Sequence, residues 1–135
     1  MNYYAVLDTN VLVSALLKKD SVPAIILKNV AQGIIIPLYN EEIFDEYGDV
    51  LHRVKFHFTN RDIQEVFDLI KERGTAVNAE PVTVDFNDID DVVFYEVVME
   101  KRKTDDAWLV TGNIRHFPKE PFIVTPREML NIITI

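Results

Sequence analysis

Four places in the 135-residue chain carry oxygen side chains of the kind that bind hard cations. Asp8 follows one apolar run, Glu46 lies in an acidic stretch, Asp88 and Asp91 precede another apolar run, and Asn113 follows a third. Several carboxylates that converge repel one another, so such a cluster is stable only when a cation or protons compensate. A carboxylate cluster that binds Mg²⁺ or Mn²⁺ is the usual active site for hydrolysis of phosphodiesters, because the metal activates water. The question is whether the fold brings these groups together.

The composition narrows the chemistry. The chain has no cysteine, so a metal must be held by oxygen or histidine ligands. The net charge of −8 argues against capture of nucleic acid over the whole surface, although a bound cation would still contact phosphate. The length fits one domain over residues 1–135. No apolar run reaches transmembrane length and no signal peptide is recognisable, so we expect a cytoplasmic protein without membrane contact.

The first apolar run predicts a buried strand followed directly by a helix. Residues 3–7 form a short continuous apolar run typical of a buried strand, and residues 11–17 are typical of a helix. Asp8 therefore lies at the carboxyl end of the strand, where open α/β sheets bind ligands. The alternative is that Asp8 only caps the helix, since Asp, Thr and Asn are all good caps.

The next elements repeat this alternation. Ser21 as a cap and Pro23 in the first turn predict a helix that ends near Gly33, followed by a strand over residues 34–38 that Pro37 closes. The apolar residues of the stretch 41–51 have helical spacing. Glu46 lies at the margin of that stripe, so its carboxylate is either solvated or directed at a site.

The second half of the chain continues with helices and short strands. Thr59 caps a predicted helix over residues 62–73 that Gly74 ends, and a short strand follows at residues 75–77. An acidic stretch at residues 85–91 then precedes an apolar helix, whose positive N-terminus favours carboxylates. The remaining predictions are a strand over residues 107–110 that ends at Thr111, a strand over residues 122–124, and a last helix that Thr125 and Pro126 open.

This order of elements predicts an α/β fold, a three-layer sandwich in which a small, mainly parallel sheet is flanked by helices. Because the carboxyl ends of parallel strands meet at one edge, Asp8 and Asn113 should share that edge. The chain lacks the motifs of other nucleotide-binding and phosphoryl-transfer proteins. A dehalogenase-like phosphatase needs a second Asp at the position of Asn10, and the chain has no P-loop.

The sequence also resembles a known family along nearly its whole length and in motif order. It is similar to PIN-domain proteins of the toxin branch of bacterial toxin–antitoxin systems. The segments that carry the resemblance are residues 6–16 (VLDTNVLVSAL), 42–51 (EIFDEYGDVL), 88–97 (DIDDVVFYEV), 109–118 (LVTGNIRHFP) and 122–128 (FIVTPRE).

The resemblance implies a VapC-like, Mg²⁺- or Mn²⁺-dependent ribonuclease. Asp8, Glu46 and Asp91 match its catalytic, metal-binding acids, and Asp88 is a possible further ligand. The resemblance further implies RNA as substrate, a cognate antitoxin protein as partner, and a homodimer. It places two supporting residues beside Asp8, namely Thr111 and Asn10.

Asn113 departs from the family pattern, in which many members have Asp at this position. An amide oxygen can bind a cation but brings no charge, so we expect weaker metal binding and a single tight site. Asp105 and Asp106 precede the strand whose other end carries Asn113, so they should not compensate. The alternative function is therefore a PIN-fold binding or regulatory protein with little or no nuclease activity.

Two further residues follow Asn113 in the loop. Arg115 could take a phosphate of the substrate. His116 either contacts the substrate or only orders the loop, and the sequence leaves this open.

Overall fold

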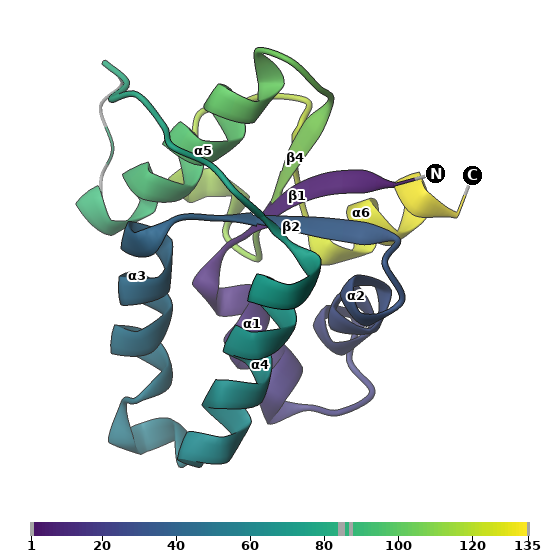
Figure 1. Ribbon diagram of the computed structural model, residues 1–135, viewed down its shortest axis with the longest axis vertical. Helices are drawn as coiled ribbons and strands as arrows, with labels where there is room; N and C mark the ends of the chain where they lie inside the picture. The colour runs from purple at the N-terminus through teal and green to yellow at the C-terminus, as the bar shows by residue number, and fades with distance from the viewer. Residues whose placement is uncertain (1, 84–85, 87, 135) are drawn as a thin grey trace.

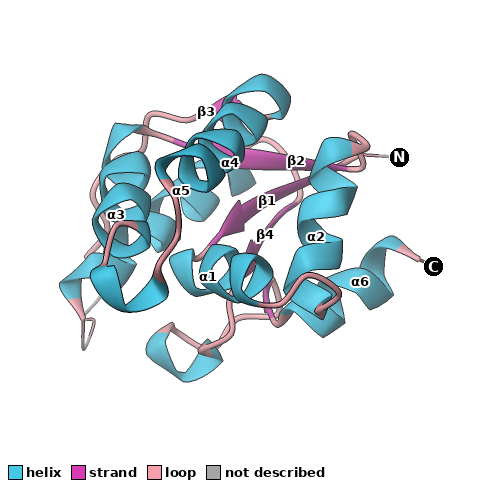
Figure 2. Cartoon of the chain, turned by 90° about the horizontal axis from the view of Figure 1, so that it is seen from below, coloured by secondary structure: helices cyan, strands magenta, loops and turns pink. Residues whose placement is uncertain are grey.

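The computed structural model describes residues 2–83, 86 and 88–134, and this part of the chain contains a five-stranded sheet. All pairings are parallel, in the order β3-β2-β1-β4-β5, with β1 in the centre (Figures 1 and 2). The strands are β1 (Tyr3–Leu7), β2 (Ile35–Tyr39), β3 (Thr75–Ala76), β4 (Ala107–Val110) and β5 (Ile123–Val124). These strands confirm the predicted parallel α/β architecture. Val84, Asp85 and Asn87 of the predicted connection and acidic stretch lie outside the described residues.

Six α-helices in the described part of the chain flank the sheet. They are α1 (Thr9–Leu17), α2 (Val22–Ala31), α3 (Glu41–Leu51), α4 (Asn60–Arg73), α5 (Val92–Arg102) and α6 (Pro126–Ile133), with short 3₁₀ turns η1 (Val54–Phe56), η2 (Ile89–Asp91) and η3 (Ile114–His116). Helix α5 covers one face of the sheet, while α1 to α4 lie on the other face (Figure 1). The fold is thus the expected three-layer sandwich. None of the described helices is both long and apolar enough to cross a membrane.

Helix caps explain where several of these elements begin. The side chains of Ser21, Thr59 and Thr125 each accept a backbone hydrogen bond from the first turn of the following helix, as the sequence predicts. Each such cap contributes about 1 kcal/mol to stability. Asn40 caps α3 in the same way. The helix starts are therefore local properties of the sequence.

Pro37 is one place where the prediction was wrong, because it lies inside β2 and does not close it. β3 pairs only with Leu38 and Tyr39, so it begins beyond the position of Pro37. The missing N–H of Pro37 therefore removes no hydrogen bond of the β2–β3 ladder, and a proline is tolerated. The backbone is crowded here: a Cβ atom on Gly74 would lie 2.5 Å from the Pro37 carbonyl oxygen, which explains the glycine between α4 and β3.

The central strand is fully buried and positions the polar residue that follows it. Ala5, Val6 and Leu7 have no exposed surface, and neither do Leu109 and Val110 of the adjacent β4. This apolar burial on both faces fixes the register of the two strands. Their carboxyl ends therefore lie next to each other, and the side chains that follow them meet at one edge of the sheet.

Candidate active site

Asp8 lies at the end of β1 and has only 6% of its surface exposed. One carboxylate oxygen, Oδ1, accepts a hydrogen bond from the Thr9 backbone N–H (2.8 Å) and thereby caps α1. The other, Oδ2, accepts from the Thr111 hydroxyl (2.7 Å) and from the Asn10 amide Nδ2 (3.2 Å). Asp8 is therefore both a helix cap and a buried carboxylate with a fixed orientation, which the sequence presented as alternatives.

The loop after β4 is fastened to the start of α1 by a second set of hydrogen bonds. The Gly112 N–H donates to Oδ1 of Asn10 (3.0 Å), and the Asn113 N–H donates to the Thr111 hydroxyl oxygen (2.9 Å). These contacts exist because β4 pairs directly with β1 and brings together residues about a hundred positions apart. The Thr111 hydroxyl thus donates to Asp8 and accepts from Asn113, and these two bonds fix its orientation toward Asp8.

A cavity of about 250 Å³ opens in front of Asp8, and most of the predicted site residues line it. Its walls are Asp8, Thr9, Asn10, Val13, Glu46, Val50, Phe56, Asp88, Asp90, Asp91, Phe94, Asn113 and His116. We call this space the acidic cavity. Thr111 contacts it only through its hydrogen bond to Asp8, and Arg115 does not line it.

Asp91 is the most perturbed carboxylate of the acidic cavity. Its Oδ2 atom is buried and makes no hydrogen bond within the described residues, and the His116 Nδ1 atom lies 3.5 Å from it. Burial first, and then the charges of Asp8 and Asp88, raise the pKa of Asp91 to about 6. His116 offsets part of this effect. An unpaired buried carboxylate oxygen of this kind favours a cation or a proton as its partner.

The other acids of the acidic cavity have related environments. Burial raises the pKa of Asp8, and its three hydrogen bonds counteract the shift only in part. Burial also raises the pKa of Glu46, with Asp90 as the next largest cause. Asp88 is exposed and accepts a hydrogen bond from the Asp90 N–H (3.0 Å), so it caps η2. Like charges thus face one another across the acidic cavity.

The donor set fits a hard divalent cation in chemistry, although it is not assembled around one point. Carboxylate and amide oxygens are the ligands that Mg²⁺ and Mn²⁺ prefer, and the Asp91 Oδ2 atom accepts no hydrogen bond from the described residues. Among residues 2–83, 86 and 88–134, however, no three Asp, Glu or His side chains lie close enough together to hold one ion. Asp8 is fixed by its hydrogen bonds, so ion binding requires movement of the less constrained acids such as Glu46.

Several residues that line the acidic cavity were not predicted as site residues, among them Asp90, Thr9 and Phe56. Asp90 was only part of the acidic stretch, yet it lines the acidic cavity and raises the pKa of Glu46. Thr9 is buried, and its hydroxyl has no hydrogen-bond partner in the described part of the chain. The polar triplet that includes Asp8 was the signal for Thr9. Phe56, which comes from η1, lines the acidic cavity although no local pattern marks it as a site residue.

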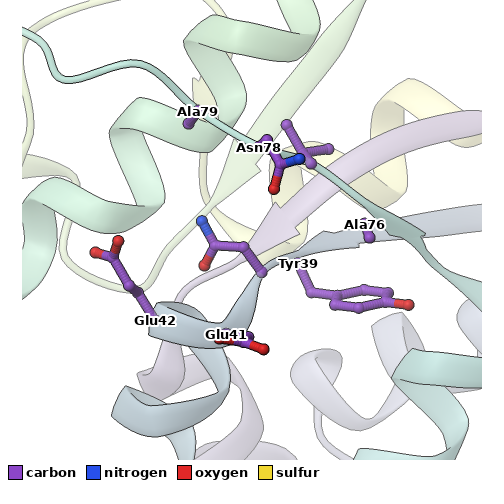
Figure 3. A pocket seen from close by; sticks show the side chains of 8 residues that line it. Tyr39, Glu41, Glu42, Ala76, Asn78 and Ala79 are labelled. Carbon is purple, nitrogen blue, oxygen red and sulfur yellow. The ribbon is translucent and has the colours of Figure 1, made fainter.

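A larger cavity of about 440 Å³ lies beside the carboxyl ends of β2 and β3 (Figure 3). Tyr39, Asn40, Glu41 and Glu42 line one side and residues 76–79 the other. In Figure 3 the Asn78 side chain extends from the segment after β3, opposite the start of α3. None of the predicted site residues lines this cavity. The carboxylates with raised pKa values, Asp8, Glu46 and Asp91, line the acidic cavity and not this one, so the acidic cavity is the candidate site.

The fold and the acidic cavity define an α/β protein with an acidic site at the carboxyl edge of a parallel sheet. A family model described as PIN domain matches residues 4–115, and the chain belongs to this family. PIN domains are generally nucleases, which sets the broad class of the protein. The chain has no significant match among curated proteins or among solved structures.

Proposed function

We propose that the protein is a divalent-metal-dependent endoribonuclease that hydrolyses RNA phosphodiesters and acts as the toxin of a toxin–antitoxin pair. The observation that supports this most directly is the acidic cavity, in which acids from three separate parts of the chain face one another. Asp8 directly after β1, Glu46 in α3, and Asp88 and Asp91 at the start and end of the η2 turn all line it. Such repulsion is retained in a fold only where something compensates for it.

Asp8, Glu46, Asp88 and Asp91 would hold Mg²⁺ or Mn²⁺. When bound, the cation supplies an activated water and neutralises charge on the phosphate. Asp8 is the fixed reference point, because three hydrogen bonds determine its orientation. Burial and neighbouring acids raise the pKa values of Glu46 and Asp91, and a bound cation would compensate for the charge that these carboxylates carry when ionised.

The proposed partners follow from family membership together with the resemblance to the toxin branch. They are RNA, a small antitoxin protein and a second copy of the chain. A neighbouring reading frame that encodes a small protein with a DNA-binding N-terminal segment would support the toxin role. The absence of such a reading frame beside this gene and beside the genes of related proteins would count against the toxin role.

RNA cleavage by nuclease-free protein tests the enzymatic proposal. We expect the wild-type protein to cleave a fluorescent RNA in Mg²⁺ or Mn²⁺, and Asp8→Asn to lower the rate by about a thousandfold or more. Circular dichroism and thermal unfolding check that the variant is folded. Asp105→Asn is the matched control, because Asp105 precedes β4 at the opposite edge of the sheet and should leave the rate unchanged. Equal rates for Asp8→Asn and wild type would assign the cleavage to a contaminant.

A PIN-fold binding protein without nuclease activity is the second candidate. Two observations favour it: Asn113 stands at the wall of the acidic cavity in place of an acid, and no three acidic or histidine side chains of the described residues are close enough to share an ion. The same assay separates the two functions. If Mn²⁺ stabilises the protein through Asp8 but no RNA is cut, the binding function is correct.

A further inference from the structure

A cavity of about 360 Å³ adjoins the acidic cavity and differs from it in charge. Its lining residues are Gly112, Asn113, Ile114, Arg115, His116 and Thr125. We call it the arginine cavity. Asn113 and His116 line both spaces, so the two cavities share a wall. Among the described residues, an arginine and no carboxylate line the arginine cavity, in a chain whose net charge is −8.

The difference in charge between the two cavities would help the protein to bind an RNA strand. An RNA strand that places one phosphate near the acids of the acidic cavity is repelled there, and a bound cation offsets this only locally. A neighbouring phosphate would be attracted by an arginine, whose planar group forms paired hydrogen bonds with phosphate oxygens. The strand therefore needs a positive site directly beside the acidic cavity.

Arg115 is available for this contact. It is exposed, and within the described ranges no carboxylate lies within ion-pair distance of it. Two other arginines have an acidic partner four residues away: Arg53 pairs with Asp49 at 3.6 Å and Arg61 with Glu65 at 3.2 Å. The guanidinium of Arg115 does not have to leave such a partner to bind an anion.

The segment that carries Arg115 is held in register with the catalytic carboxylate. At its start, the Asn113 N–H donates to the same Thr111 hydroxyl that contacts Asp8. At its end, the Phe117 N–H donates to the Ile114 carbonyl oxygen (3.1 Å), and the Phe117 ring is buried. The position of Arg115 relative to Asp8 is thus set by the fold, which is what a subsite next to a reactive centre requires.

We propose that the arginine cavity is a phosphate subsite, in which Arg115 binds a backbone phosphate that neighbours the scissile one. The RNA strand then passes over the shared wall formed by Asn113 and His116. This inference rests on the proposed nuclease function and adds to it the path of the substrate. Arg115 is a binding residue here and does not take part in the chemical step.

Binding of RNA as a function of salt tests the proposal. The affinity of a short fluorescent single-stranded RNA is measured by anisotropy in the Asp8→Asn background with Mg²⁺, so that the RNA stays intact. We expect Arg115→Gln to weaken binding by about tenfold and to reduce the slope of log K against log salt by about 0.7, the value for one phosphate contact. Arg73→Gln is the matched control: Arg73 is also exposed but lies at the end of α4, before β3 and thus at the opposite edge of the sheet. It should change neither quantity.

A series of RNAs with one neutral methylphosphonate each then locates the contact. One position next to the cleavage site should weaken binding to the protein with Arg115, and the same position should have no effect after Arg115→Gln. Additive losses, or equal behaviour of Arg115→Gln and Arg73→Gln, would overturn the subsite while wild-type cleavage of RNA continues. If wild type neither binds nor cuts RNA, the proposed function fails first and the subsite fails with it.

Discussion

The two edges of the sheet carry the same residue types in opposite electrostatic states. At the amino edge, where α5 ends and β4 begins, Asp105 pairs with Lys101 at 3.1 Å and Glu100 pairs with Lys103 at 3.0 Å. Hydrogen bonds to neighbouring side chains, Thr104 first for Asp105 and Lys103 for Glu100, lower the pKa of both acids. At the carboxyl edge, by contrast, burial raises the pKa of Asp8, Glu46 and Asp91.

The contrast separates acids that stabilise the folded state from acids that destabilise it when they are ionised. Ion pairs at the exposed amino edge are ordinary surface pairs of small energy. A buried carboxylate with a raised pKa, such as Asp91, destabilises the folded state whenever it is ionised. Acids kept in this condition on several elements indicate a binding site for a cation more strongly than the number of acids does.

A divalent cation should remove the repulsion among the buried acids at the carboxyl edge and leave the ion pairs at the amino edge unchanged. We expect Mn²⁺ at one hundred times its Kd to raise the free energy of unfolding by about 2.7 kcal/mol. Asp8→Asn should abolish the gain, because Asp8 is the one fixed ligand, whereas Asp105→Asn should keep it. Thermal unfolding with and without Mn²⁺ measures both. A gain that survives Asp8→Asn would place the ion outside the acidic cavity.

Without metal, the stability of the protein should depend on pH differently for the acids at the two edges of the sheet. The folded-state pKa of Asp91 is about 6, above the ordinary value of 3.8, so the folded state binds this proton more tightly than the unfolded state. Stability should therefore be greatest at low pH as far as Asp91 is concerned, and should fall as pH rises through about 6. After allowance for partial solvent exposure, we expect a loss of about 1 kcal/mol between pH 5 and pH 7.5.

Urea unfolding at a series of pH values in EDTA measures this slope. Asp91→Asn should flatten it. Asp105→Asn should not, since the lowered pKa of Asp105 keeps that acid ionised throughout this range, and the stability it contributes is lost only in more acidic buffer. A slope that is the same in both variants would assign the effect to other groups.

Much of the fold is predictable because its signals are local. The buried strand before Asp8 is a continuous apolar run, and the starts of α2 and α6 are marked by Ser21 and Thr125 with a proline in the first turn. Pro37 shows the limit of such reasoning, since its place inside β2 depends on where β3 begins. A local rule for proline cannot contain that information.

The site depends on contacts between distant parts of the chain, and these are less accessible from sequence. The parallel pattern predicts that Asp8 and Asn113 share an edge. The pattern alone does not predict that the Thr111 hydroxyl donates to Asp8, a neighbour that only the family resemblance suggested. It also does not predict that the buried Tyr47 hydroxyl donates to the Leu7 carbonyl oxygen and fixes α3 there. Strand order and helix packing decide both contacts.

The smallest expected effect concerns the residue that departs from the family pattern. Asn113→Asp adds one more carboxylate to the lining of the acidic cavity, so Mn²⁺ should bind several-fold more tightly because the ligand charge rises. The same charge should make the metal-free protein slightly less stable at neutral pH, since it lies near Asp8 and Asp91. Asn78→Asp is the matched control: it makes the same chemical change in the larger cavity of Figure 3 and should leave Mn²⁺ affinity unaltered. Calorimetric titration of both variants decides the point, because equal gains would mean that net charge, and not the position of Asn113, controls the affinity.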